Sequence, residues 1–481
     1  MNESKLTNAQ VTKYSMYGLT SFMAMMPAFM YYRTFMQVNL GVPAGLLAVL
    51  VLIGTGTDFV LSLVAGPIVE KTSGGKHGKY RFFFKIFPWV MLAGTVICFA
   101  APTSIASPLA KGLICILGYI LICGSVTFLG NANFGIMAAM AGPSMVDRNR
   151  MSVKGAQMMA LSTIVTSLTI LPVKDTIYKA TGNEQLGYLL VSGIFGLTIL
   201  IGAKCVLDVS KDYDLPRPAL TAEQKAAVKG VSVGEMFASV AQNRQLLVLM
   251  LVYTVYNFGF NFAAGFEVFF FMFLKLTPAT FAAAMTTHAT VRSVASLVGS
   301  MIGPKLGMKL GKKNAIAVGL GLWGLGLLGS YFVIGRAPWY VYTVFGAFNA
   351  MAMYIFSGFG VNYFLDCGEY GYYKTGKDNR TIAMAMFNIP IKIATMLAGT
   401  MSAAALGWIS FDTVSIGGGA VTPAIEKGFM FWFTLFPAIC MFVAVALMVF
   451  CYKITDKDAA MYAAENAKRD AELRAAQAQA N

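Results

Sequence analysis

The first candidate for chemistry in this sequence is a carboxylate in an otherwise apolar stretch. Asp58 is the only acidic residue between positions 44 and 69, and Thr55 and Ser62 lie three residues before it and four residues after it. This spacing places the three side chains on one face of a helix. An ionised acid in hydrocarbon costs at least about 2.5 kcal/mol, so such a residue normally faces a partner or a water-filled pathway. We therefore predict that Thr55, Asp58 and Ser62 form the site of a coupling cation, H⁺ or Na⁺.

Other ionisable residues also lie in apolar stretches, namely Arg33, Glu267, Arg292 and Lys392. Together with Asp58 they make three cations and two anions, which leaves one positive charge in excess. An uncompensated buried charge is costly, and a guanidinium is suited to binding a carboxylate through two hydrogen bonds. We therefore predict an anionic solute. Two alternatives stay open, because Arg33 could extend to the lipid headgroups and Glu267 could lie at the outer mouth.

Two further stretches carry polar side chains at every fourth position. These are His288, Arg292, Ser296 and Ser300 in one stretch and Tyr253, Asn257 and Asn261 in the other. Residues four apart share a helix face, and polar stripes are costly in lipid, so each stripe should face a cavity or a partner. The asparagine stripe suits sugar hydroxyls. We predict that both stripes bind the solute, with a structural ion pair as the alternative for Arg292.

The elements that hold these residues follow from the composition. The 481 residues are 57% hydrophobic and 12% charged, and many apolar runs reach the roughly 20 residues that span a bilayer. We identify twelve such runs, at about 13–38, 44–69, 82–102, 109–141, 154–174, 185–207, 244–273, 279–303, 314–335, 338–365, 381–407 and 428–452. The sequence therefore predicts an all-α polytopic membrane protein with twelve transmembrane helices in two six-helix bundles, with the solute bound between the bundles.

Charge defines the predicted domains and the topology. The domains are an N-terminal bundle at 1–207, a cytoplasmic linker with an amphipathic segment at 208–243, a C-terminal bundle at 244–453 and a cytoplasmic tail at 454–481, which we expect as a solvated helix or a disordered extension. The net charge is +15, and most of the 37 lysines and arginines lie in alternate loops and tails. Because such residues concentrate in cytoplasmic loops, both termini should be cytoplasmic. This pattern reports topology rather than nucleic-acid binding.

Two charged motifs resemble those of a known family. The loop after the second span reads Lys76-His77-Gly78-Lys79-Tyr80-Arg81, and the segment after the tenth span reads Asp366-Cys367-Gly368-Glu369-Tyr370-Gly371-Tyr372-Tyr373-Lys374-Thr375-Gly376. Both are similar to signatures of the glycoside-pentoside-hexuronide:cation symporters, the melibiose-carrier branch of the major facilitator superfamily. The chain differs from that family at Phe82, where proline is common, and at Ser62, where a second acid is common. With one carboxylate in place of two, we favour H⁺ over Na⁺.

The resemblance implies further residues of the binding site. In this family the first span lines the sugar pocket, the fourth span carries a sugar-binding acid near the position of Asn131 and Asn133, and a lysine corresponding to Lys392 is associated with the cation and sugar sites. The sugar-binding acid of the first span has no counterpart here, which also favours an anionic solute. We predict Lys392 as the charge partner of Asp58. The predicted substrate-binding residues are Tyr32, Arg33, Asn131, Asn133, Tyr253, Asn257, Asn261, Glu267, His288, Arg292, Asn388 and Lys392.

The charged motifs themselves predict a cytoplasmic gate. Acids and bases where helices meet the cytoplasm can form ion pairs that exchange between inward-open and outward-open states. We predict that the segments 71–85 and 366–380 form this gate, and a solvated charged loop is the alternative. The predicted gate residues are Lys79, Arg81, Asp366, Glu369, Tyr370, Lys374 and Arg380.

These observations together predict a cation-coupled secondary symporter that imports a glycoside-like solute, an acidic sugar or uronide, by alternating access. A lysolipid or other amphiphile carrier of the same branch is the nearest alternative, and a channel is a more distant one. The sequence has no nucleotide-binding glycine loop, metal-ligand cluster or pair of catalytic acids, so we expect no enzyme activity, no metal and no cofactor. We expect a monomer in the bacterial cytoplasmic (inner) membrane, with lipid, solute and coupling cation as partners and no nucleic acid.

Overall fold

The computed structural model describes residues 5–72, 77–100, 105–142, 144–215, 240–274, 278–334, 336–377, 380–415 and 418–480. Within these residues all regular structure is helical and no strand occurs. The greater part of the predicted linker, residues 216–239, lies outside the described residues, as does Lys76 of the basic loop.

The first part of the chain forms six long helices. Their bounds are α1 Asn8–Thr34, which continues into the π-helical turn η1 Phe35–Asn39, then α2 Ala44–Lys71, α3 Arg81–Phe99, α4 Pro108–Ala141, α5 Met145–Thr181 and α6 Glu184–Val209. Local sequence explains several of these ends. Ser107 caps α4, which begins with proline, and Asn183 caps α6 by accepting the Leu186 N–H at 3.0 Å.

The second part of the chain is also helical, and its longer helices are interrupted more often. The bounds are α9 Arg244–Phe273, α10 Pro278–Leu310, α11 Lys312–Val333, α12 Trp339–Ser357, α13 Gly360–Thr375, α14 Arg380–Ala385, α15 Asn388–Trp408, α16 Asp412–Ser415, α17 Pro423–Met430, η3 Phe431–Leu435, α18 Phe436–Ala446, η4 Leu447–Cys451 and α19 Asp456–Ala480.

The membrane-spanning elements agree with the sequence prediction. Among the described residues, ten helical segments are long and apolar enough to cross a membrane. Two other long helices, α1 with 27 residues and α10 with 33, carry more polar side chains. These two and the ten segments correspond to the twelve predicted spans, and the predicted fold class is confirmed.

Helical structure continues beyond two of the predicted spans, 279–303 and 338–365. Residues 303–310 form the last turns of α10, and most of the signature 366–376 belongs to α13. The glycines of α10 serve packing rather than a turn, because a Cβ at Gly303 would lie 2.3 Å from the Tyr354 carbonyl oxygen and one at Gly307 would lie 2.4 Å from the Ile355 carbonyl oxygen. In the signature only the last glycine ends a helix. Gly376 has φ +72°, the left-handed conformation that closes α13.

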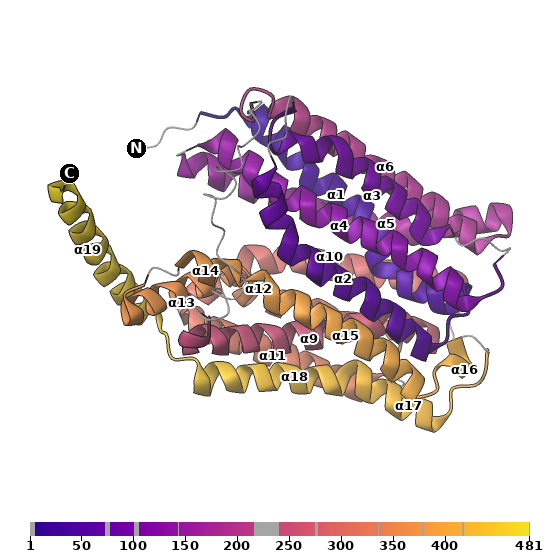
Figure 1. The fold of residues 1–481 in the computed structure, drawn as a ribbon. Helices are drawn as coiled ribbons and strands as arrows, with labels where there is room; N and C mark the ends of the chain where they lie inside the picture. The colour runs from indigo at the N-terminus through magenta and orange to yellow at the C-terminus, as the bar shows by residue number, and fades with distance from the viewer. Residues whose placement is uncertain are drawn as a thin grey trace. The chain divides into compact units, whose positions relative to one another are not determined.

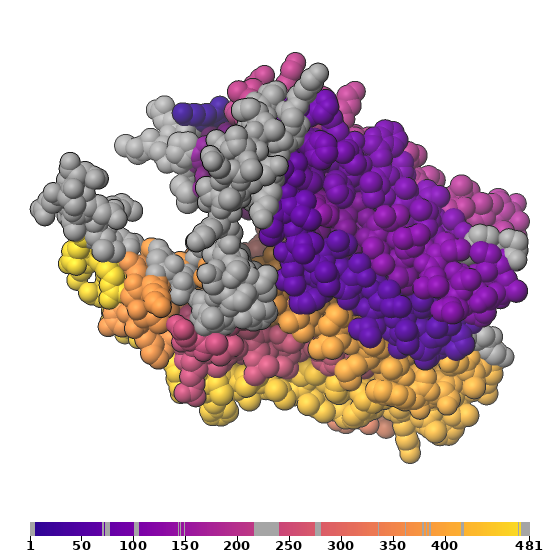
Figure 2. Space-filling view, viewed as in Figure 1, coloured from indigo at the N-terminus to yellow at the C-terminus, as the bar shows by residue number. Residues whose placement is uncertain are grey.

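The chain forms two compact units. Unit 1 consists of Met1–Gly230, Val268–Ser293 and Gly399–Ile425, and unit 2 consists of Val231–Glu267, Val294–Ala398 and Glu426–Asn481. In unit 1, α1 packs along α5 and α6, α3 packs along α4 and α6, and α2 packs along α4 (Figure 1). In the space-filling view, atoms coloured indigo to magenta, which belong to this part of the chain, form a closely packed surface (Figure 2).

In unit 2, α11 packs along α12 and α18, and α13 packs on α14 and α19. The core of this unit contains aromatic pairs such as Phe262 with Phe266 and Phe266 with Phe429, whose ring centroids lie 5.4 and 5.3 Å apart. The predicted domain boundaries stay a prediction.

Candidate functional site

The predicted cation site lies in the middle of α2. Thr55 and Asp58 are buried, with 3% and 5% of their surfaces exposed, and Ser62 is half-buried. The Thr55 hydroxyl donates to the Val51 carbonyl at 2.7 Å, and the Ser62 hydroxyl donates to the Phe59 carbonyl at 2.6 Å. The helix itself uses these hydroxyl protons, which leaves oxygen lone pairs on the face of the carboxylate as possible cation ligands. The assignment of these residues to a cation stays a prediction.

Tyr119 on α4 joins the surroundings of Asp58 to α1, and sequence reasoning did not identify it. Gly54, one turn before Asp58, leaves room for its ring, because a Cβ at position 54 would lie 3.1 Å from Tyr119 Cδ1. The Tyr119 ring also stacks on Tyr32, with centroids 4.5 Å apart and planes at 18°. The glycine one turn from the acid was a signal of close helix approach, but it could not tell which helix approaches.

Arg33, in the last turn of α1, is held by neutral groups. Its Nε donates to Tyr32 Oη at 3.1 Å, its Nη1 donates to Ser402 Oγ at 3.4 Å, and its Cζ lies 5.4 Å from the Tyr32 ring centroid. Gly399 leaves room for the guanidinium, because a Cβ there would lie 3.0 Å from Nη2. Sequence reasoning did not identify Ser402 or Gly399. Arg33, Tyr32 and Tyr119 thus form one continuous series of side chains within unit 1, and this series meets α2 at Gly54, one turn from Asp58.

The asparagines that we predicted to bind sugar donate to their own helices. On α9, Asn257 Nδ2 donates to the Tyr253 carbonyl and Asn261 Nδ2 donates to the Asn257 carbonyl, both at 2.8 Å. On α4, Asn131 Nδ2 donates to the Thr127 carbonyl at 2.9 Å. In each of these hydrogen bonds the side chain uses one amide hydrogen, and its oxygen is a potential acceptor for a solute hydroxyl.

Two other predicted residues lie in packed surroundings. Tyr253 is 2% exposed, and its ring centroid lies 5.1 Å from those of both Tyr256 and Phe364. Asn133 accepts a hydrogen bond at its backbone carbonyl from Tyr14 Oη at 3.0 Å. Their roles in solute binding stay predictions.

The remaining charged candidates are divided between the units. His288 and Arg292 lie on α10 in unit 1, where His288 is 1% exposed and contacts the Phe271 ring edge-on at 5.4 Å. Glu267, Asn388 and Lys392 lie in unit 2. Because Asp58 belongs to unit 1, its predicted pairing with Lys392 stays a prediction. Among the described residues no cluster of three His, Cys, Asp or Glu side chains could hold a metal ion.

An acid that is distant in sequence organises the gate residues of unit 1. Asp214, which is 1% exposed, accepts the backbone N–H groups of Lys79 at 3.2 Å, Tyr80 at 2.7 Å and Arg81 at 2.8 Å. Its carboxylate therefore caps the start of α3. Gly78 has φ +83°, and a Cβ there would lie 2.3 Å from the Asp214 carbonyl oxygen. We had assigned Asp214 to the linker and did not identify this contact.

Asp366 of the signature pairs with a lysine of the basic segment that follows α10. Lys312 Nζ donates to Asp366 Oδ2 and lies 3.8 Å from Asp456 Oδ1. The Lys312 backbone N–H donates to Asp456 Oδ2 at 3.1 Å, and Tyr363 Oη donates to the Lys312 carbonyl at 2.8 Å. One lysine therefore gathers two acids at the start of α11.

Glu369 connects the signature to the C-terminal helix. Its Oε1 lies 3.4 Å from Arg380 Nη1, and Asn466 Nδ2 on α19 donates to its Oε2 at 2.6 Å and to its carbonyl at 2.9 Å. The Tyr372 ring contacts two guanidinium groups, with Arg380 Cζ 4.8 Å and Arg469 Cζ 5.4 Å from its centroid. The predicted tail is helical, as one of our two alternatives stated, but its packing on α13 was not foreseen.

The other signature residues extend this contact. Lys374 Nζ donates to Tyr370 Oη at 3.4 Å, and Tyr462 of α19 contacts Tyr370 with ring centroids 5.6 Å apart. At the start of α19 the Thr455 hydroxyl and N–H donate to Asp458 Oδ2 at 2.7 and 2.9 Å. These hydrogen bonds, chiefly the one from the hydroxyl, lower the pKa of Asp458.

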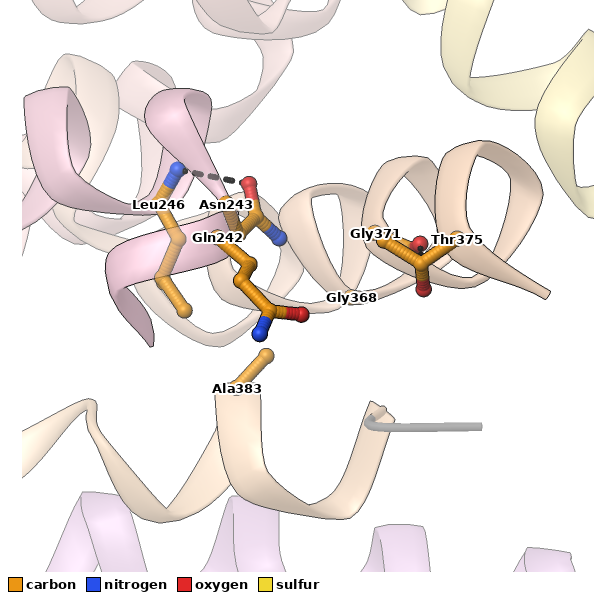
Figure 3. Close-up of a pocket in the computed structure, with 7 residues that line it drawn as sticks. All are labelled: Gln242, Asn243, Leu246, Gly368, Gly371, Thr375 and Ala383. Atoms are coloured by element: carbon orange, nitrogen blue, oxygen red, sulfur yellow. Dashed lines mark hydrogen bonds between the residues drawn. The ribbon is translucent and has the colours of Figure 1, made fainter. Parts of the chain in front are cut away.

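A junction between α9 and the signature helix surrounds a cavity of about 10 Å³. Figure 3 shows its lining residues, which are Gln242, Asn243, Leu246, Gly368, Gly371, Thr375 and Ala383. Asn243 Nδ2 donates to the Cys367 carbonyl at 2.7 Å, and its Oδ1 accepts the Leu246 N–H at 3.1 Å. A Cβ at Gly371 would lie 2.7 Å from Asn243 Nδ2. The volume fits about one water molecule and no sugar, so this is a packing junction.

Solved structures of other proteins share the fold. The nucleoside transporter NupG is 13% identical and matches with a TM-score of 0.60 over 91% of this chain and 98% of its own. A bacterial homologue of the human drug peptide transporters PepT1 and PepT2 is 15% identical and matches with a TM-score of 0.61 over 92% of this chain and 98% of its own. At these identities the likeness establishes the fold alone.

Sequence comparison gives the family. The family model for MFS/sugar transport proteins matches residues 14–456. A relative in Bacillus subtilis (strain 168), named the uncharacterized symporter YjmB, is 23% identical over 420 residues, which are 87% of this chain and 86% of the relative. The chain is therefore a multi-pass membrane transporter, not an enzyme, and it belongs to the MFS/sugar transport protein family, in the melibiose-carrier-like branch that its two charged motifs predict.

Proposed function

We propose that this protein is a cation-coupled symporter that imports an acidic sugar or uronide-like glycoside by alternating access. It acts in the bacterial cytoplasmic (inner) membrane with both termini in the cytoplasm. The observation that carries the proposal is the series of contacts within unit 1 that runs from the cation Arg33 through Tyr32 and Tyr119 to Gly54, one turn from the buried acid Asp58 on α2. A cation site and an anion-binding group that share packed neighbours can affect each other's occupancy, which is the requirement for coupled transport.

The cation half of the proposal rests on Asp58. A carboxylate buried in a membrane helix is costly, and such residues mark ion or solute pathways. The chain carries one acid on this face, since Ser62 stands where the family commonly has the second. One carboxylate suffices for a proton, whereas Na⁺ prefers several oxygen ligands, so we propose H⁺ as the first ion to test and Na⁺ as the second.

The solute half rests on Arg33. Among the described residues, its side chain donates to the neutral hydroxyls of Tyr32 and Ser402. A half-buried guanidinium with these neutral partners retains its full charge for a ligand, and its planar fork matches a carboxylate. An acidic solute supplies that carboxylate, and the family's description as sugar transport supports a sugar frame for it.

Uptake by the purified protein in liposomes tests the proposal. A radiolabelled uronide should accumulate when a proton or a sodium gradient is imposed, one at a time, and not in the absence of both. Asp58→Asn should abolish accumulation while solute exchange continues, because the variant stays neutral without a cation. An Asn variant that concentrates solute as well as the parent would refute the cation site. Uptake of a lysolipid in place of every sugar tested would favour the amphiphile carrier.

The solute class is tested by affinity. Arg33→Gln, and separately Arg292→Gln, should weaken binding of an acidic sugar by about 2 to 5 kcal/mol, the range for breaking a buried charge pair. The binding of a neutral analogue should change far less. An equal loss for both solutes would mean that the arginine is structural, and tight binding of a neutral disaccharide to the parent would refute the anionic solute.

A further inference from the structure

Helix α2 begins without a cap from its own sequence. Its N-cap residue, Pro43, makes no side-chain hydrogen bond to the helix, and the first N–H groups of a helix have no partner inside it. Asp412, from the segment after α15, takes this place. Its Oδ2 accepts the Ala44 N–H at 3.1 Å, and its Oδ1 accepts Gln37 Nε2 at 2.6 Å. Gln37 lies in η1 and is fully buried, whereas Asp412 is half-buried.

The chain after α15 holds Asp412 in a fixed position. Helix α15 ends at Trp408, and Ser410 then adopts φ +55°, a left-handed conformation that is strained for a residue other than glycine. Phe411 follows with none of its surface exposed and packs edge-on against Phe269, with centroids 6.0 Å apart. Strain of this kind persists only when the surroundings enforce it, and here it directs the next residue, Asp412, to the start of α2.

The same region of α15 packs closely on α2. Gly399, Ala403 and Gly407 are four residues apart and share one helix face. A Cβ at Gly407 would lie 3.2 Å from the Ala44 Cβ, and one at Gly399 would lie 3.1 Å from Val51 Cγ1. All these segments belong to unit 1. The carboxylate of Asp412 therefore completes a close contact between helices that are more than 300 residues apart in the sequence.

The turn between α1 and α2 is also held from its other side. Asn39 Nδ2 donates to Glu184 Oε2 at 3.0 Å, Gln185 Nε2 donates to the Asn39 carbonyl at 3.3 Å, and Lys174 Nζ pairs with Glu184 Oε1 at 2.7 Å. These contacts join the turn to the corner between α5 and α6, within the predicted N-terminal bundle. They keep the turn in place whether or not Asp412 is bound, so Asp412 is the contact that can break without disturbing the bundle.

We infer that Asp412 is a positioning residue of the transport cycle. Its carboxylate holds α15 against the turn between α1 and α2 and so closes the solute pathway at this end of the helices. Opening at this end breaks the hydrogen bonds to Gln37 and Ala44 and separates the two helices. The inference rests on the proposed function, because alternating access requires a closure at each end that can be released.

Accessibility of a buried cysteine tests this closure. Ala403, 2% exposed, is changed to cysteine in the full-length protein after replacement of its seven native cysteines. A membrane-impermeant maleimide is then applied to the side opposite the termini, in liposomes. Asp412→Ala should raise the labelling rate of the Ala403→Cys protein about tenfold, the factor for losing a hydrogen bond to a charged group. Gln37→Glu, which places a second carboxylate against Asp412, should raise it as well.

The matched control is Glu184→Gln, which loosens the other side of the same turn and should change the labelling rate less than twofold. An unchanged rate in both Asp412→Ala and Gln37→Glu would overturn the inference, and so would an equal rise in Glu184→Gln or labelling from the side of the termini alone. Labelling does not require a transported solute. If the labelling rate depends on Asp412 but the parent protein moves no solute, the closure by Asp412 stands and the symport proposal fails. If the parent protein accumulates solute but Asp412 has no effect on labelling, only the closure by Asp412 fails.

Discussion

Gly371 of the signature offers a test by mutation. Gly371→Ala should lower the stability of the parent protein and raise the stability of a variant that lacks the Asn243 side chain. In the described residues, the atoms within 4 Å of a Cβ at position 371 belong to Asn243, whose Nδ2 would lie only 2.7 Å away. Asn243 is not free to move, because it donates to the Cys367 carbonyl and accepts the Leu246 N–H. Gly371→Ala should therefore displace Asn243 and break both hydrogen bonds.

The magnitude follows from the two hydrogen bonds and the helix. Each bond contributes about 1 kcal/mol, one as a buried hydrogen bond and one as a helix cap. Against this loss of about 2 kcal/mol, alanine in place of glycine inside a helix stabilises by roughly 0.5 to 1 kcal/mol. Gly371→Ala alone should thus destabilise by about 1 to 1.5 kcal/mol. In an Asn243→Ala background the clash is absent, and the same change should stabilise by roughly 0.5 to 1 kcal/mol.

The assay is the apparent melting temperature in detergent. It is measured for the parent, Gly371→Ala, Asn243→Ala and the double variant. Gly321 of α11 provides the control, since nothing lies within 4 Å of a Cβ at that position. Gly321→Ala should leave stability unchanged or slightly raised in both backgrounds. If Gly371→Ala destabilises equally with and without Asn243, the reasoning is refuted, and the signature requires this glycine for another reason.

Three further changes test the contacts of the charged motifs. Asp366→Lys would face Lys312 and should slow transport with little change in solute affinity; a large loss of affinity at an unchanged maximal rate would assign Asp366 to the binding site instead. Asn466→Ala removes two hydrogen bonds from α19 to Glu369 and should lower stability by about 1 to 2 kcal/mol, so an unchanged melting temperature would mean that α19 adds nothing to unit 2. Asp214→Asn weakens three hydrogen bonds at the start of α3 and should cost about 2 kcal/mol, whereas Asp212→Asn, at an exposed position, should cost less than about 0.5 kcal/mol; equal effects of the two changes would rule out the cap.

The features that were predictable from the sequence depend on local patterns. A bilayer requires about 20 apolar residues per helix, so span length alone gave the fold class. The two charged motifs are contiguous in the chain, and they led to the family that the comparisons confirm. Helical periodicity placed Thr55, Asp58 and Ser62 on one face of a helix. Periodicity does not show which other helix packs against that face. The neighbours of that face were therefore not predictable.

The missed residues share a physical reason. Tyr119 lies against Gly54 from another helix, and Asp214 and Asp412 each bind the backbone of a segment more than 130 residues away. A backbone N–H is the same for every residue type, so the sequence at the donor carries no mark of the distant acid. The packing of Gly303 against α12 was likewise not predictable, because glycine serves turns and close helix packing alike.

In both halves of the chain, an acid that is distant in sequence binds the start of the third helix. Helices α3 and α11 each follow a basic segment, and neither receives a side-chain cap from its own N-cap residue, Tyr80 or Gly311. Each start instead binds an acid, Asp214 or Asp456, that lies five residues beyond the end of the sixth spanning segment of its half, at Val209 or Cys451. A carboxylate is favoured there by the helix dipole. Each acid therefore ties the third helix of its half to the chain that leaves the sixth, without residues of the other half. Such contacts within each half are a condition for the alternating access that we propose, in which two bundles move as rigid bodies.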